Sequence, residues 1–270
     1  MMAENEILTE KQNAIFTITL NRPEKRNAMP FEWLPQICDI VEQQITDADI
    51  RCIVLQGAGE MFSAGVDFNS LGLLVGRYTA DHAAGGASIR AEINKYQQYL
   101  NRLESIEIPI ICAMHKRVFG MAMELALACD IRLMSDDCKW SMPELRFGLV
   151  ADMGGTARLS RIIGPSRAME VLMTSREYDA AKAEKWGLVN DVFPVKTLNE
   201  EALRLAADIS KMAPMAVGAT KRIVKKGLDQ DLMTQLDMES SLQSILIRTE
   251  DFQEGIMALM EKRKPQWRRK

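Results

Sequence analysis

Apolar and polar positions in the first two thirds of the chain follow the periods of strands and helices in turn. Residues 15–20 alternate apolar side chains with Thr, and residues 52–55 and 110–114 are short apolar runs. These segments predict strands, the last two of them buried. Apolar side chains recur with helical spacing over 37–45 and again over 89–103. The alternation of strand and helix indicates an α/β core with crossover connections.

The last third of the chain shows helical patterns only. Three apolar stripes recur at helical spacing, over residues 198–212, 232–246 and 252–259, and no strand pattern follows Val195. We therefore predict an α/β core over residues 1–195 and a helical region over residues 196–270. Because the stripes are broad, we expect this region to pack on the core or on a neighbouring subunit.

Composition narrows the class of protein. The formal charge of −3 gives no reason to expect a nucleic acid or an anionic membrane as partner. The N-terminal residues are polar and acidic, and no apolar run approaches the ~18 residues that a membrane span needs. The five cysteines form no CxxC pair, and the two histidines lack ligand spacing, which argues against disulfides and a metal site. We expect a cytoplasmic protein, with an organelle matrix as the alternative.

One carboxyl group stands out in an apolar setting. Glu124 is the single residue of the run 118–129 that is neither apolar nor Gly. A buried unpaired carboxylate costs several kcal/mol, so it needs a partner or a function. We interpret Glu124 as a substrate-facing group in the first turn of a buried helix; a purely structural role is the alternative. Gly120, just before it, would leave free N–H donors suited to an oxyanion.

Two further segments carry candidate chemistry. A Gly-containing turn over residues 60–68 follows a buried strand and would allow close approach of a ligand, unless it is an ordinary strand-to-helix turn. Glu144 lies among apolar residues after Pro143, and Asp152 precedes a Gly-Gly pair. Three carboxyl groups near one apolar pocket could divide acid and base work, because each raises the pKa of the others. By itself, Asp152 fits better as the N-cap of a following helix.

Six motifs, in order, resemble those of the enoyl-CoA hydratase/isomerase (crotonase) superfamily. They are the stretches 21–28 (NRPEKRNA), 62–67 (FSAGVD), 124–130 (ELALACD), 143–144 (PE), 154–159 (GGTARL) and 180–189 (AAKAEKWGLV). The resemblance implies a spiral of ββα repeats with a C-terminal helical region, assembled as a homotrimer or a dimer of trimers. It implies an acyl-CoA thioester as substrate and no cofactor, since coenzyme A is part of the substrate.

The resemblance also implies roles for individual residues. The thioester oxyanion would be held by the backbone N–H groups of Val66 and Met121. In hydratases of the family two Glu residues do the chemistry, and they match Glu124 and Glu144. The contacts with substrate and CoA map to Lys25, Arg26, Ala28, Ala64, Asp67, Phe68 and Gly120.

The sequence departs from the family pattern in two places. The family usually has N-G-x-x-x-G-G-G before the catalytic helix, whereas this chain has Lys116, Met121 and Ala122 where three of the glycines stand. A positive φ required at Met121 would cost on the order of 1 kcal/mol. Residues 70–90 form a longer insertion, which, with Asp152, is more like the dienoyl-CoA isomerases.

Three functions follow from these residues. The first is a hydratase that adds water across a 2-enoyl-CoA with Glu124 and Glu144. The second is an enoyl- or dienoyl-CoA isomerase in which Glu144 and Asp152 move a proton. The third is a non-catalytic binding protein with the crotonase fold, which the altered glycines favour slightly and the retained glutamates oppose.

Overall fold

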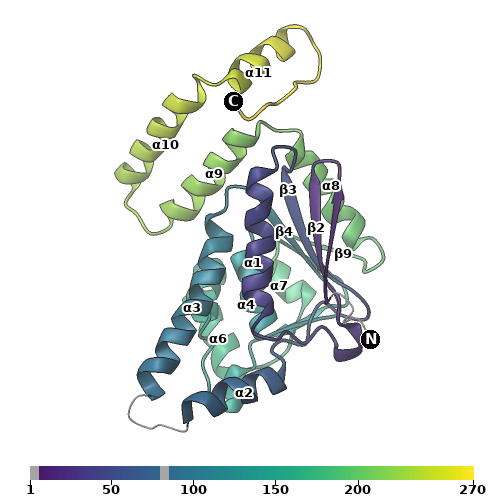
Figure 1. Ribbon diagram of the computed structural model, residues 1–270, viewed down its shortest axis with the longest axis vertical. Helices are drawn as coiled ribbons and strands as arrows, with labels where there is room; N and C mark the ends of the chain where they lie inside the picture. Colours follow the sequence, from purple (N-terminus) through teal and green to yellow (C-terminus); the bar gives the residue numbers. More distant parts are fainter. Residues whose placement is uncertain (1–5, 80–84) are drawn as a thin grey trace.

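The computed structural model describes residues 6–79 and 85–270 and is built around a six-stranded sheet. The strand order is β1-β2-β3-β4-β6-β9 (Figure 1). Neighbouring strands are parallel except β1 and β2, which form an antiparallel pair. The bounds are β1 Ile7–Gln12, β2 Ile15–Leu20, β3 Cys52–Gly57, β4 Ile110–Met114, β6 Ile131–Ser135 and β9 Asp191–Phe193.

The apolar runs in β3 and β4 arise because both faces of this sheet are covered. Alternate residues of β3 point to opposite faces, so Cys52 and Val54 belong to one apolar cluster and Ile53 and Leu55 to another. Helix α8 (Leu198–Ser210) covers the first face. The second faces the main core, formed with α1 (Trp33–Gln43), α3 (Gly85–Ser105) and α4 (Met121–Ala128). A parallel sheet covered on both faces needs continuous apolar strands.

A second, three-stranded sheet turns the chain into a spiral. It contains β5 (Arg117–Phe119), β7 (Lys139–Ser141) and β8 (Tyr178–Asp179). Each strand of the large sheet from β4 to β6 is followed by a short strand of the small sheet and then by a helix, α4 or α5 (Gly155–Ile163). These are ββα turns, and they bring the residues after β5 and after β7 to the same side of the molecule.

The helical region after β9 has one part on the core and one part away from it. Helix α8 is packed on the large sheet, and α9 (Pro214–Gly227), α10 (Leu232–Leu246) and α11 (Glu250–Met260) form an arm that extends beyond it (Figure 1). The first helix of this arm, α9, is tied to the core through the ion pair of Lys221 with Asp130. No residue of α10 is buried, and large apolar side chains are exposed along this arm. The predicted boundary at residue 195 falls between β9 and α8.

Most predicted elements are confirmed. The strands over 15–20 and 110–114 have the predicted bounds as β2 and β4, and the stripe over 89–103 lies within α3. No prediction covered the short strands of the small sheet, β1, α6 (Pro165–Thr174), α7 (Ala180–Trp186) or α9. The 70–90 insertion contains most of α2 (Phe68–Thr79) and the start of α3, and its residues 80–84 lie outside the described residues. All five cysteines are buried free thiols. Within the described ranges, no helix is long and apolar enough to cross a membrane.

Candidate active site

Glu124 is a buried carboxyl group held by the backbone of another segment. It lies in the first turn of α4, with 3 % of its surface exposed. Its Oε1 accepts hydrogen bonds from the N–H groups of Met153 (3.0 Å) and Gly155 (2.9 Å) at the start of α5. These donors favour the ionised carboxylate and give it one fixed orientation. A side chain at Gly155 would not fit, because its Cβ would lie 2.7 Å from Glu124 Oε1.

Glu144 reaches the same place from the small sheet. It begins the short 3₁₀ helix η3 (Glu144–Phe147), after Pro143 and β7. A Cβ at Gly120 would lie 2.8 Å from Glu144 Oε1, so this carboxyl group is packed against the turn that starts α4. Its Oε2 is buried, and no group in the described residues hydrogen-bonds to it. An unpartnered buried oxygen favours the protonated form of Glu144.

The surroundings of the two glutamates raise their pKa values toward neutral pH. Burial and the charge of Glu144 together raise the pKa of Glu124 to about 8, against the opposing backbone hydrogen bonds. Burial raises the pKa of Glu144 to about 7, helped by the charge of Asp152. The higher pKa of Glu124 would place the shared proton there, whereas the two N–H donors to Glu124 Oε1 and the unpartnered Oε2 of Glu144 favour it on Glu144. Near neutrality the pair therefore holds about one proton, which supplies one acid and one base together.

Asp152 joins this group and does not cap α5. The N-cap of α5 is Gly154, and no side chain caps it, so the interpretation of Asp152 as an N-cap is wrong. Glu124 takes that place by accepting from Met153 and Gly155. Burial raises the pKa of Asp152, and its charge raises the pKa of both glutamates. The expected cluster of three interacting carboxyl groups is present.

The two predicted oxyanion donors lie on adjacent turns. The turn at Gly65 touches the end of β5: a Cβ on Gly65, which has a φ of 95°, would lie 2.7 Å from the carbonyl oxygen of Phe119. Val66 follows Gly65, and Met121 follows Phe119 by two residues, so the contact brings their N–H groups together. Within residues 6–79 and 85–270, neither N–H has a hydrogen-bond acceptor. Met121 is the first residue of α4, where an N–H has no intrahelical partner.

The strain expected at Met121 lies elsewhere. In the turn before α4 the positive φ belongs to Gly120 (51°), and neither Met121 nor Ala122 has one. Of the three positions where glycine is replaced, Lys116 has the positive φ, at 60°. The backbone cost of the altered glycines therefore falls before β5 and leaves the Met121 N–H in place.

The predicted CoA-contacting residues lie around two loops that are tied together. The Ala64 N–H donates to the carbonyl of Arg26 (3.0 Å), and buried Asn27 donates to the carbonyls of Ala58, Met61 and Phe62. Lys25 and Arg26 are exposed beside this junction, as a phosphate contact requires, and Ala28 is half-buried. Asn27 belongs to the loop 25–28 to which the resemblance assigns CoA contacts, and its part in joining the two loops was not predicted.

Asp67 and Phe68 make different kinds of contact: Asp67 is hydrogen-bonded within the turn, and Phe68 packs against another ring. The Asp67 carboxylate accepts from Arg22 (2.7 Å) and from the N–H of Asn69 (2.8 Å) at the start of α2, which lowers its pKa against the effect of burial. It therefore fixes the turn. The Phe68 ring is exposed and packs edge-on against Phe147, with centroids 5.3 Å apart. This pair joins α2 to the segment that carries Glu144.

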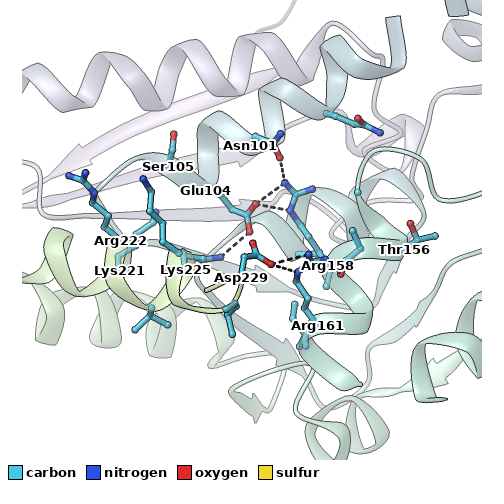
Figure 2. Close-up of a pocket in the computed structure, with 18 of the residues that line it drawn as sticks. Asn101, Glu104, Ser105, Thr156, Arg158, Arg161, Lys221, Arg222, Lys225 and Asp229 are labelled. Carbon is cyan, nitrogen blue, oxygen red and sulfur yellow. Dashed lines mark hydrogen bonds and ion pairs between the residues drawn. The ribbon is translucent and has the colours of Figure 1, made fainter. Parts of the chain in front are cut away.

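A cavity of about 820 Å³ lies between α3, α5 and α9 (Figure 2). Asp152 and Gly154 line it, but Glu124 and Glu144 do not. Its charged side chains are largely paired with one another: Arg158 and Lys225 with Glu104, and Arg161 with Asp229. The cavity thus lies behind the loop that carries Asp152.

Comparison with known proteins identifies the family of the chain. Residues 10–270 match the family model described as enoyl-CoA hydratase/isomerase. The chain belongs to the enoyl-CoA hydratase/isomerase family. It is 31 % identical over 265 residues to the 2,3-dehydroadipyl-CoA hydratase of Escherichia coli, covering 98 % of this chain and 99 % of that protein. It is 30 % identical over 258 residues to a peroxisomal Δ(3,5)-Δ(2,4)-dienoyl-CoA isomerase of Arabidopsis thaliana, covering 94 % and 93 %.

Solved structures of the family share the fold. An enoyl-CoA hydratase from Bacillus anthracis superposes with a TM-score of 0.89 at 30 % identity, covering 98 % of this chain and all of that one. The predicted crotonase fold is therefore confirmed. Relatives at similar identity include hydratases and isomerases, so similarity establishes an enzyme family and leaves the reaction to the chemistry of the site.

Proposed function

We propose that this protein is an enoyl-CoA hydratase that adds water across the 2,3 double bond of an enoyl-CoA thioester. The observation that carries the proposal is the pair formed by buried Glu124 in α4 and half-buried Glu144 beside it in η3, whose surroundings raise their pKa values to about 8 and about 7. Hydration needs a base for water and an acid for carbon at the same moment, and a pair with one proton provides both. Relatives named as hydratases support the same reaction.

The proposed reaction runs as follows. The thioester oxygen accepts hydrogen bonds from the N–H groups of Val66 and Met121, which stabilise the negative charge that develops there. Glu124 takes a proton from the water whose oxygen bonds to C3, and Glu144 gives its proton to C2. The net change is one water added, with the proton moved from Glu144 to Glu124. No cofactor takes part, because coenzyme A belongs to the substrate.

Double-bond isomerisation is the second candidate. Asp152 favours it, since its side chain does not cap α5 and its charge raises the pKa of both glutamates. In this reaction Glu144 and Asp152 would remove a proton from one carbon and return one further along the acyl chain. The third candidate is a non-catalytic binding protein, which would have no need of two glutamates with pKa values near neutral pH.

A paired assay separates these candidates. Hydration of a short 2-enoyl-CoA and isomerisation of a 3,5-dienoyl-CoA are measured on wild type and on Asp152→Asn. We expect strong hydration in wild type that changes by less than about threefold in Asp152→Asn, because water addition needs only the two glutamates. The melting temperature serves as control. Strong isomerisation that falls at least tenfold in Asp152→Asn would instead establish the isomerase, and saturable binding with neither activity would establish the binding protein.

We also propose that the protein is a homotrimer or a dimer of trimers. The arm carries exposed apolar side chains on every helix, among them Val224, Leu232, Met233, Leu259 and Met260. A surface of this kind is usually covered by another protein chain. Light scattering at micromolar concentration should give three or six times the 30.4 kDa mass of one chain. A mass of one chain under these conditions would contradict the proposal.

A further inference from the structure

Two side chains, Gln97 and Arg158, hold the loop 151–155 from the side opposite to Glu124. The peptide unit that joins Asp152 to Met153 makes two hydrogen bonds: its N–H donates to Glu124 Oε1, and its carbonyl accepts from Gln97 Nε2 at 2.6 Å. Because a trans peptide is planar, with N–H and C=O pointing opposite ways, fixing the carbonyl fixes the direction of the N–H. A carbonyl oxygen can only accept, so the Gln97 atom beside it must be the amide nitrogen.

The next peptide unit, between Met153 and Gly154, is held by its carbonyl. The carbonyl of Met153 accepts from Arg158 Nη1 at 3.1 Å. Arg158 is fixed in turn by α3, since its guanidinium donates to Glu104 Oε2 (2.9 and 2.7 Å) and to Asn101 Oδ1 (2.7 Å), as Figure 2 shows. Its side chain is 11 % exposed. A Cβ at Gly154 would lie 2.0 Å from Arg158 Nη1, so glycine is required there for the guanidinium to reach the carbonyl.

We propose that Gln97 and Arg158 are positioning residues for Glu124, acting through the two peptide units that they hold. Neither touches Glu124. Gln97 fixes the peptide unit that carries the Met153 N–H, and Arg158 fixes the peptide unit between Met153 and Gly154, which lies between the two donors of Met153 and Gly155. Both donors orient the Glu124 carboxylate and stabilise its ionised form. Helix α3, which carries Gln97 and the partners of Arg158, thereby sets the geometry of a site to which it contributes no reacting group. The inference rests on the proposed use of Glu124 as a base.

The kinetic test compares Gln97→Met with Gln98→Met. Met keeps the length of Gln but has no N–H to donate, and Gln98 is the exposed neighbour on the same helix. We expect kcat for a 2-enoyl-CoA to fall about 10- to 100-fold in Gln97→Met, with KM changed less than about twofold, because a misplaced catalytic group loses rate rather than affinity. Gln98→Met should match wild type. Arg158→Met, with exposed Arg161→Met as its control, should behave likewise.

A second readout needs no substrate. The amide resonance of Gly155 in glycine-labelled protein reports the protonation of its acceptor, Glu124, and is identified by its loss of titration in Glu124→Gln. Losing a donor to the carboxylate raises the pKa of Glu124, so the titration should move to higher pH in Gln97→Met and Arg158→Met and stay in place in both controls. Replacing a residue that only stiffens the fold would lower the melting temperature and leave the pH of the Gly155 titration unchanged.

The outcomes are distinct. If Gln97→Met and Gln98→Met agree in kcat and in the Gly155 titration, the proposal is overturned, whatever their melting temperatures. If wild type turns over no enoyl-CoA, the proposed function fails, but the Gly155 titration still decides whether the two residues hold Glu124. Should Gln97→Met not fold, Arg158→Lys replaces it: Lys keeps the charge toward Glu104 and loses the planar fork, so a shifted titration supports the proposal and an unchanged one overturns it.

Discussion

Glu144→Gln is expected to lower kcat for a 2-enoyl-CoA by about 10²- to 10⁴-fold while the fold and KM stay close to wild type. The amide has the shape of the carboxyl group but has no acid proton to give to C2. The exposed residue Glu184 provides a matched control, since Glu184→Gln makes the same change on the surface. A Glu144→Gln enzyme with turnover near wild type would remove Glu144 from the mechanism.

The pH dependence of the wild-type enzyme tests the same assignment. With pKa values of about 7 and about 8, the pair is doubly protonated in acid and loses its base, and it is doubly ionised in alkali and loses its acid. We expect kcat/KM to peak between these values and to fall on both sides. The residual activity of Glu144→Gln should lack the alkaline fall, because that variant has no second proton to lose.

Glu124→Gln is expected to stabilise the folded protein at alkaline pH while it removes the base. In the folded state the pKa of Glu124 is about 8, against an ordinary value of 4.5. The folded state therefore binds this proton more tightly, and the group destabilises the fold progressively as the pH rises from 4.5 toward 8. Gln carries no charge, and its amide oxygen can accept the two bonds that Oε1 now accepts.

The measurement is the free energy of unfolding of wild type and Glu124→Gln across this range. The two proteins should be similar near pH 4.5, and the variant should be more stable by on the order of 3 kcal/mol at pH 8. Glu184→Gln, an exposed change, should show no such dependence. A variant that is less stable than wild type at pH 8 would mean that the ionised carboxylate, and not its neutral form, stabilises the loop 151–155.

The local pattern of apolar residues was enough to predict the elements that are buried along their whole length. The run 110–114 is buried at every position in β4, and an apolar run follows whenever helices cover both faces of a sheet. Glu124 could be recognised because a carboxyl group within a long apolar run must have partners or a function. The strands of the small sheet have only two or three residues, which is too short for an alternating pattern to be seen.

The partners of each candidate catalytic group were determined by the tertiary structure. Glu124 is bound by N–H groups 29 and 31 residues away, and Gln97 holds a peptide 55 residues away. Helix capping by Asp152 was the local expectation, but Glu124 reaches the same N–H groups from α4, and no local rule contains that contact. Likewise, the positive φ values fall at Lys116 and Gly120, on either side of β5, whose Phe119 carbonyl packs against Gly65. Hydrophobic periodicity indicates which side of an element is buried. The arrangement of the elements in the spiral determines which buried atoms are in contact.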